Sequence, residues 1–284
     1  MPFQQARRFL AKSIRPRRET WVLLAAKSRG GLVSDFSTAK TLFAPRGAFW
    51  ADPIAVERDG RVHLFAEEFV EQTHRGRIVC LILDEEGRVA ARQVALEQPY
   101  HLSYPFIFEH RRETYMIPET AEHRAVELYR CMRWPDRWEF VHNLLSDIYA
   151  VDATLLNHSD HWWMFANLKS EPGASSWDEL HLYFADDPLS AKWTLHPLNP
   201  VVSDVHNARP AGPIFAHEGA LHRPAQDCSV RYGYAVNLNR IETLTESAYA
   251  EARVKTILPR AGLLGTHTLS RAGGWEFMDG VIRK

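Results

Sequence analysis

Apolar and polar residues alternate along this chain in a unit that occurs four times. Each copy has an apolar run of about five residues, a short polar turn, a second apolar run, and then a polar residue. Three copies align without a gap and the fourth aligns when one turn residue is deleted: DPIAVERDGRVHLFAE (52–67), YPFIFEHRRETYMIPE (104–119), DATLLNHSDHWWMFAN (152–167) and GPIFAHEGALHRPAQ (212–226). Two apolar runs around a short polar turn are typical of a β-hairpin.

The spacing of these copies predicts a β-propeller. They start 52, 48 and 60 residues apart, and further strand-like segments lie between them, at 76–84, 125–132, 179–185 and 232–241. Two hairpins in about 50 residues match one four-stranded blade, whereas a helical solenoid would need a 3.6-residue rhythm. A weaker fifth unit at 265–280 makes five blades, closed by a strand at 21–26. We therefore predict one all-β, five-bladed propeller domain over residues 21–284.

The first part of the chain, residues 1–20, is predicted to be a basic extension. Residues 1–18 carry several Lys and Arg side chains and no acidic one, with a few apolar residues between them. A helix on a membrane surface would explain this pattern, and so would a solvated basic segment before the first strand. The weak apolar face favours the solvated segment and leaves peripheral membrane contact as the alternative.

Composition excludes several other classes of protein. The chain has 284 residues, 45% of them hydrophobic, and a formal charge of -1, so it lacks the basic field that drives binding to nucleic acid. Three cysteines without a CxxC spacing argue against a disulfide framework and a zinc site, and favour a reducing compartment such as the cytoplasm. The sequence has neither a membrane-span-length apolar run nor a secretory signal, and the phosphate-binding motifs GxGxxG and GxxxxGK are absent.

Carboxylates occupy the positions that a propeller would bring together. If the first strand of each copy is innermost, the first residues of the copies meet at one mouth of the central channel, and two of them are Asp52 and Asp152. The hairpin ends add Glu67, Glu68 and Glu119. Crowded, partly desolvated carboxylates acquire different pKa values, so that one serves as an acid and another as a base. Such a pair suits chemistry at a glycosidic centre.

Longer motifs carry a resemblance to a known family. FWADPIAV, FAEE, HLSYPFIFEH, MIPET, AVDATLL, WWMFA, NARPAGPIF and RPAQDCSVRYG, spread from about Trp21 to the C-terminus, resemble the N-terminal domain of glucosamine inositolphosphorylceramide transferase and related bacterial proteins of surface-polysaccharide loci. That domain is similar to the five-bladed propellers of arabinanases, xylosidases and invertases. By this resemblance Asp52 is a base or nucleophile, and Asp152 tunes its pKa.

The chain departs from those glycosidases at one catalytic position. Where they place a Glu general acid, this sequence has NARPAGP, with Arg209 and no carboxylate. Glu119, Glu67 or Asp227 remain as alternative proton donors. An arginine at the mouth would instead suit an anionic ligand, a phosphate or a uronate.

Several other residues are predicted to bind ligand. Arg223, Gln226 and Asp227 are candidates for a sugar clamp, although Arg223 and Asp227 could equally form an ion pair between blades. Trp50 and Tyr104, near the mouth, are candidates for stacking on a sugar ring, and His267 is a further candidate for binding substrate. No metal-binding motif or cofactor is predicted, but a channel cation held by a histidine is an alternative, and the candidates for it are His101, His206 and His267.

Three functions fit these observations. The protein is a carbohydrate-active enzyme that transfers or cleaves a glycosyl unit, a noncatalytic sugar-recognition module that works with a separate glycosyltransferase or formyltransferase, or a platform for protein interaction. The recurring carboxylates favour the first two, with a sugar, oligosaccharide or nucleotide sugar as the ligand. We expect a role in bacterial surface glycan or polysaccharide biosynthesis.

Overall fold

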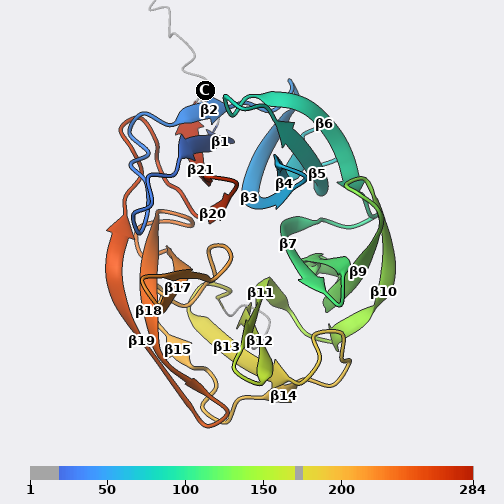
Figure 1. Ribbon diagram of the computed structural model, residues 1–284, viewed down its shortest axis with the longest axis vertical. Coiled ribbons are helices and arrows are strands. Elements are labelled where there is room, and N and C mark those ends of the chain that lie inside the picture. Colours follow the sequence, from blue (N-terminus) through green and yellow to red (C-terminus); the bar gives the residue numbers. More distant parts are fainter. Residues whose placement is uncertain (1–18, 170–174, 284) are drawn as a thin grey trace, which may run out of the picture.

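The structure is a five-bladed β-propeller. The computed structural model describes residues 19–169 and 175–283, which form five antiparallel sheets around a central axis (Figure 1). The predicted fold is therefore confirmed. No helix within these residues is long and apolar enough to span a membrane. Most of the basic extension lies outside the described residues, although Glu19 and Thr20 already belong to the first strand.

Each repeat of the sequence forms one blade. Blade 1 contains β3 (Ala48–Arg58), β4 (Arg61–Val70), β5 (Arg75–Leu83) and β6 (Val89–Leu96). Blade 2 contains β7 (Ser103–His110), β8 (Glu113–Glu119), β9 (Ala125–Arg133) and β10 (Arg137–Ser146). Blade 3 contains β11 (Ala150–His158), β12 (His161–Leu168), β13 (Glu179–Ala185), β14 (Thr194–Leu195) and β15 (Val202–Ser203). Blade 4 contains β16 (Phe215–His217), β17 (Ala220–Asp227), β18 (Ala235–Thr245) and β19 (Ala248–Ile257).

The fifth blade joins the two ends of the described chain. Its strands are β20 (Leu269–Ala272), β21 (Trp275–Arg283), β1 (Glu19–Lys27) and β2 (Lys40–Leu42), and β1 pairs with β21 along its whole length. The predicted N-terminal closing strand is therefore confirmed. A short 3₁₀ turn, η1 (Ala121–His123), follows β8.

The innermost strands share one backbone distortion near their start. Asp52, Tyr104 and Asp152 have φ values of +52°, +41° and +54°, and the strand register shifts beside each of them. The fourth copy has Gly212 there, with φ +124°, where a Cβ atom would lie 1.9 Å from a backbone oxygen. Such bulges turn a side chain out of the normal alternation, and strained backbone is common at functional sites.

Large apolar side chains fill the spaces between blades. Trp162 and Trp163 illustrate the rule, because adjacent residues on a strand face opposite sides of the sheet. Trp162 packs against the cluster between blades 2 and 3, and Trp163 belongs to the one between blades 3 and 4. As predicted, the two rings therefore support opposite sides of blade 3.

Candidate functional site

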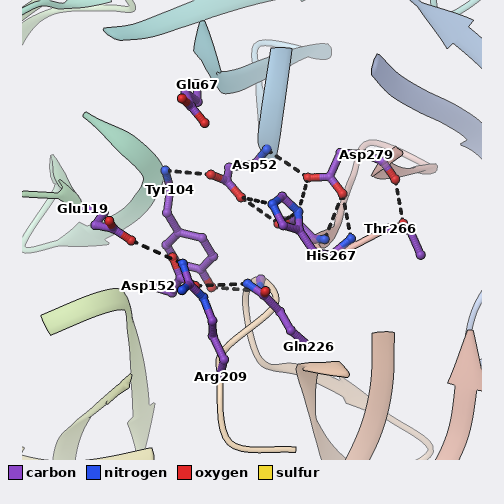
Figure 2. Close-up of polar contacts among 12 residues, drawn as sticks. Asp52, Glu67, Tyr104, Glu119, Asp152, Arg209, Gln226, Thr266, His267 and Asp279 are labelled. Atoms are coloured by element: carbon purple, nitrogen blue, oxygen red, sulfur yellow. Dashed lines mark hydrogen bonds and ion pairs between the residues drawn. The ribbon is translucent and has the colours of Figure 1, made fainter. Parts of the chain in front are cut away.

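Five acidic side chains from four blades gather at one end of the channel. Figure 2 shows Asp52 and Glu67 of blade 1 with Glu119 of blade 2, Asp152 of blade 3 and Asp279 of blade 5. They meet because each inner strand starts, and each neighbouring strand ends, at this rim. We call this group the acidic cluster. The four carboxylates predicted to be catalytic thus lie together, and Asp279 was not predicted.

Asp52 is held by hydrogen bonds from three other segments of the chain. Its Oδ2 accepts from the backbone N–H of Tyr104 at 3.3 Å, and its Oδ1 accepts from the Thr268 hydroxyl at 2.9 Å. Its own N–H donates to Asp279 at 3.1 Å. Burial raises the pKa of Asp52 to about 6, and the charges of Asp152 and Asp279 act in the same direction, while His267 opposes them. Asp52 therefore titrates close to neutral pH.

Asp279 fixes the geometry of His267. Its Oδ1 accepts from the backbone N–H groups of His267 and Thr268, at 2.8 and 3.1 Å, and its Oδ2 lies 2.6 Å from His267 Nδ1. The other ring nitrogen, Nε2, lies 3.8 Å from Asp52 Oδ1. Burial lowers the pKa of His267, but Asp279 and Asp52 outweigh burial and raise it overall. The histidine is therefore held between two carboxylates in a setting that favours the imidazolium.

Among the residues that the structure describes, the same three form a candidate cation site. Asp52, His267 and Asp279 offer ligand atoms that all lie within 4.8 Å of one another. However, His267 Nδ1 is engaged by Asp279, so a metal would have to compete with the imidazolium proton for the same carboxylates. The other candidates are placed differently, because His206 contacts Asp227 and His101 lies beside Glu67.

Arg209 is paired with carboxylates. Its Nε lies 2.5 Å from Asp152 Oδ2, and its Nη2 lies 3.7 Å from Glu119 Oε2. Gln226 donates to the same Asp152 oxygen at 3.1 Å and to the Pro210 carbonyl at 3.0 Å. Burial lowers the pKa of Arg209, but the carboxylates outweigh it and raise it well above its usual value. Arg209 is thus neutralised within the site, which argues against the predicted clamp for a phosphate or uronate.

Glu67 and Glu119 are the groups best suited to carry a proton. Burial raises the pKa of both well above the usual value, and neighbouring carboxylates add to the effect. Arg209 opposes it for Glu119. Glu119 Oε2 has no hydrogen-bond partner within the described residues. A carboxylic acid that stays protonated near neutral pH can act as a general acid.

Asp227, the third predicted proton donor, faces other partners. Its Oδ1 accepts from the backbone N–H and the hydroxyl of Ser229, at 3.0 and 2.6 Å, and its Oδ2 lies 3.2 Å from His206 Nδ1. Burial raises the pKa of Asp227, but these contacts outweigh burial and lower it overall. This corrects the prediction, because the contacts favour the carboxylate, which has no proton to donate.

Trp50 and Tyr104 are placed where neither ring can stack on a ligand. Trp50 is 3% exposed in the core between blades 5 and 1, and its Nε1 donates to Glu68 at 3.0 Å. Tyr104 is fully buried, and its hydroxyl accepts from the Gly212 N–H at 2.8 Å and contacts Thr154 Oγ1 at 2.7 Å. The prediction of two stacking platforms is therefore wrong. Tyr104 instead links blades 2, 3 and 4 beside the acidic cluster (Figure 2).

Arg223 is part of a structural ion pair, but with a partner that was not predicted. Its Nε and Nη2 contact the Glu251 carboxylate at 2.8 and 2.6 Å, and Nη2 also donates to the Asn207 carbonyl at 2.6 Å. The side chain is 1% exposed. The predicted pairing with Asp227 does not form. The contacts with Glu251 join β17 to β19 and use the Arg223 donors Nε and Nη2, so these donors are not free for the predicted sugar clamp.

An aromatic wall beside the acidic cluster was missed by the sequence analysis. The Tyr232 ring lies 5.0 Å from the Arg209 guanidinium carbon and meets His267 edge-on at 5.3 Å. The Trp177 ring centre is 5.9 Å from that of Tyr232, and Trp177 is 37% exposed. Tyr232 lies in the RPAQDCSVRYG motif, where the polar residues drew attention first. Asp279 could have been found in the sequence as an acidic residue near the middle of the otherwise apolar segment FMDGVI, at the end of the chain.

The fold and the site together define a five-bladed propeller with an acidic cluster at its centre, and the five-bladed fold is shared with glycosidases. A family 117 glycoside hydrolase of Zobellia galactanivorans has the same fold, with a TM-score of 0.59 and 10% identity over 92% of this chain and 90% of that one. The GH62 α-L-arabinofuranosidase catalytic domain of Coprinopsis cinerea gives a TM-score of 0.62 and 12% identity over 92% and 97%. At these identities the likeness concerns the fold alone.

The chain belongs to the family described as glucosamine inositolphosphorylceramide transferase 1, N-terminal, whose model matches residues 35–262. Glucosamine inositolphosphorylceramide transferase 1 of Oryza sativa subsp. japonica is 35% identical over 247 residues, which cover 82% of this chain and 33% of that protein. The resemblance inferred from the sequence motifs is confirmed. The chain spans about a third of the length of the curated relatives it matches.

Proposed function

We propose that this protein is carbohydrate-active and that it transfers or cleaves a glycosyl unit at the acidic cluster. The observation that carries the proposal is the contrast among its carboxyl groups. Asp52 has a pKa of about 6 and accepts two hydrogen bonds, while burial holds the pKa of Glu67 and Glu119 well above the usual range. One base and one acid in a single site are what displacement at a glycosidic centre requires.

The residues take distinct roles in such a reaction. Asp52 acts as the base that removes a proton from an acceptor hydroxyl or water, or as the nucleophile at the anomeric carbon. Glu67 or Glu119 gives a proton to the leaving oxygen. Asp152, held in place by Arg209 and Gln226, directs a carboxyl oxygen toward the oxocarbenium-like transition state. The aromatic wall supports a sugar ring, because Trp177 offers an exposed face next to these groups.

The biological setting that we propose is surface glycan or polysaccharide biosynthesis in bacteria, with a nucleotide sugar or an oligosaccharide as the ligand. The name of the curated relatives, a glycosylating transferase, supports glycan assembly over degradation. All three cysteines are free, which supports a reducing compartment such as the cytoplasm.

A noncatalytic sugar-recognition module is the second candidate. One observation favours it: the chain has Arg209, and no carboxylate, at the position where the resemblance to glycosidases implies a general acid. In this case the acidic cluster would bind a sugar for a separate glycosyltransferase or formyltransferase.

Calorimetry and mass spectrometry on three proteins test these proposals. Wild type, Asp52→Asn and the control Asp227→Asn are screened against nucleotide sugars and bacterial surface oligosaccharides. An enzyme gives binding in all three and turnover in wild type and the control only. Binding in all three without turnover supports the recognition module, and absence of binding to any sugar would rule out both proposals.

A further inference from the structure

A backbone hydrogen bond fixes the protonation state of His101, a residue that lies beside Glu67. The backbone N–H of Gly76 donates to His101 Nδ1 at 3.0 Å, so Nδ1 carries a lone pair and no proton. The ring is therefore the neutral tautomer, with its proton on Nε2. Burial lowers the pKa of His101, against the opposing charge of Glu122, which agrees with a neutral ring.

The protonated nitrogen faces the Glu67 carboxyl. His101 Nε2 lies 3.4 Å from Glu67 Oε1, slightly longer than the usual hydrogen bond. Since Nε2 carries the proton, it can only donate, and Oε1 can only accept. Within the described residues no hydrogen bond reaches the Glu67 side chain from any other group.

The chain around this contact is packed too tightly for it to be incidental. A Cβ atom at Gly76 would lie 2.8 Å from Glu67 Oε1, 2.8 Å from His101 Cε1 and 2.4 Å from the Leu102 carbonyl oxygen. The backbone around His101 is anchored as well, because its N–H donates to Glu122 at 2.7 Å and the Leu102 N–H donates to Gly76 at 3.1 Å. Glycine at position 76 thus lets the ring and the carboxyl approach each other.

We propose that Glu67 is the proton donor of the acidic cluster and that His101 is the residue that positions the Glu67 side chain. With Oε1 accepting from His101, the acidic proton of Glu67 resides on Oε2, the oxygen left free to protonate a leaving group. In the reaction the O–H bond of Glu67 breaks, a bond forms between that proton and the leaving oxygen, and the glycosidic electron pair goes to that oxygen. The anomeric carbon forms its new bond to the Asp52 carboxylate or to the acceptor oxygen that Asp52 deprotonates. This inference rests on the proposed function.

The charges around the two candidate acids favour Glu67 over Glu119. The charged groups that act on Glu67 from the surrounding strands are Asp52, Glu119, Asp279 and Asp152, all carboxylates that oppose loss of its proton. Burial, Asp152 and Asp52 also raise the pKa of Glu119. The Arg209 guanidinium 3.7 Å away opposes them, and among the described residues no cation opposes the shift at Glu67 in this way. A neutral histidine orients Glu67 without supplying such a cation.

Two substitutions separate positioning from mere structural support. In His101→Asn the amide oxygen replaces Nδ1 and keeps the Gly76 hydrogen bond, but the side chain no longer reaches Glu67. In His101→Gln the amide nitrogen replaces Nε2 and keeps the donor to Glu67. The infrared C=O band of the protonated Glu67 carboxyl at neutral pH is identified as the band that disappears in Glu67→Gln.

We expect this band in wild type and at nearly the same wavenumber in His101→Gln. In His101→Asn it moves to higher wavenumber, because the carbonyl oxygen has lost its donor, although the melting temperature stays near that of wild type. Absence of a band that depends on Glu67, or an equal shift in both variants, would overturn the proposal. If His101 only supported the backbone, His101→Gln would have the lower melting temperature of the two variants, because it loses the Gly76 hydrogen bond that His101→Asn keeps.

Leaving-group dependence tests the donor role separately. Glu67→Gln should lower kcat on glycosides with poor leaving groups by about 10²- to 10⁴-fold and leave phenol-type leaving groups nearly unaffected. His101→Asn should show the same selectivity to a smaller degree, and His101→Gln should recover most of the loss. Equal losses on both substrate types, or none in Glu67→Gln, would refute the assignment. If wild type turns over no substrate, the proposed function and the donor role both fail, while the infrared result still decides the contact between His101 and Glu67.

Discussion

Replacing Asp52 by Asn should stabilise the protein at high pH and leave its stability nearly unchanged at low pH. In the unfolded chain Asp52 ionises near its usual value of 3.8, but in the folded protein, where it is 6% exposed, its pKa is about 6. As pH rises through this window, ionisation stabilises only the unfolded state, so folding stability falls and the loss is complete above pH 6. The difference amounts to about 3 kcal/mol, since each pH unit corresponds to about 1.4 kcal/mol.

Asn carries no such penalty, because its amide does not ionise. At pH 4 the folded wild type holds a neutral carboxyl group, which has one carbonyl oxygen beside Tyr104 and Thr268, as the Asn amide has. We therefore expect Asp52→Asn to be more stable than wild type by about 3 kcal/mol at pH 8 and nearly as stable as wild type at pH 4. Thermal scans should show this as a relative change in Tm of roughly 6 to 12 °C between the two pH values.

Urea denaturation at pH 4, 6 and 8 measures the effect, with Asp227→Asn as a control of opposite sign. Burial raises the pKa of Asp227, but the Ser229 and His206 contacts outweigh burial and lower it. Its carboxylate therefore adds stability above the unfolded pKa that is lost as pH falls, so the control should lose stability at pH 8 and little at pH 4. A pH-independent difference between Asp52→Asn and wild type would refute the argument that burial dominates at Asp52.

Three further substitutions test the structure. Arg223→Met should destabilise by about 3 to 5 kcal/mol, because it leaves the Glu251 carboxylate buried without its partner, and an unchanged sugar titration would separate this from a binding role. Gly76→Ala should lower the urea midpoint and also remove the Glu67 infrared signature, and a neutral result would contradict the tight packing there. Tyr104→Phe should cost about 1 to 3 kcal/mol in denaturation, since the buried Gly212 N–H loses its acceptor, and a cost near zero would mean that this hydrogen bond contributes nothing.

Much of the fold and part of the site could be predicted from repetition. A repeated hairpin pattern specifies blades, and equivalent positions in the blades of a propeller necessarily meet around one axis. Asp52 and Asp152 could be assigned to the mouth because they begin two copies, and Glu67 and Glu119 because they end the paired strands. No knowledge of individual contacts was needed for these four.

Other parts of the site depend on contacts between residues far apart in the sequence. Asp279 comes from the closing blade, and its role follows from the hydrogen bonds that it accepts from Asp52, His267 and Thr268. Asp52 lies 227 positions away in the sequence. Arg209 resembled a free cation in the sequence, but it is neutralised by carboxylates of two other blades. Trp50 precedes Asp52 by two residues in the sequence, and yet its ring packs in the core between blades.

The sequence by itself thus determined the blades, their closure and the set of carboxylates at one rim, because these follow from the period of the repeat and the alternation of side chains along strands. Only the tertiary structure decided which partner each charged group has, as in the pairing of Arg223 with Glu251 and the contact of His101 with Glu67. The physical reason is that pairing and burial depend on side-chain direction and on packing between blades, which local sequence patterns do not encode.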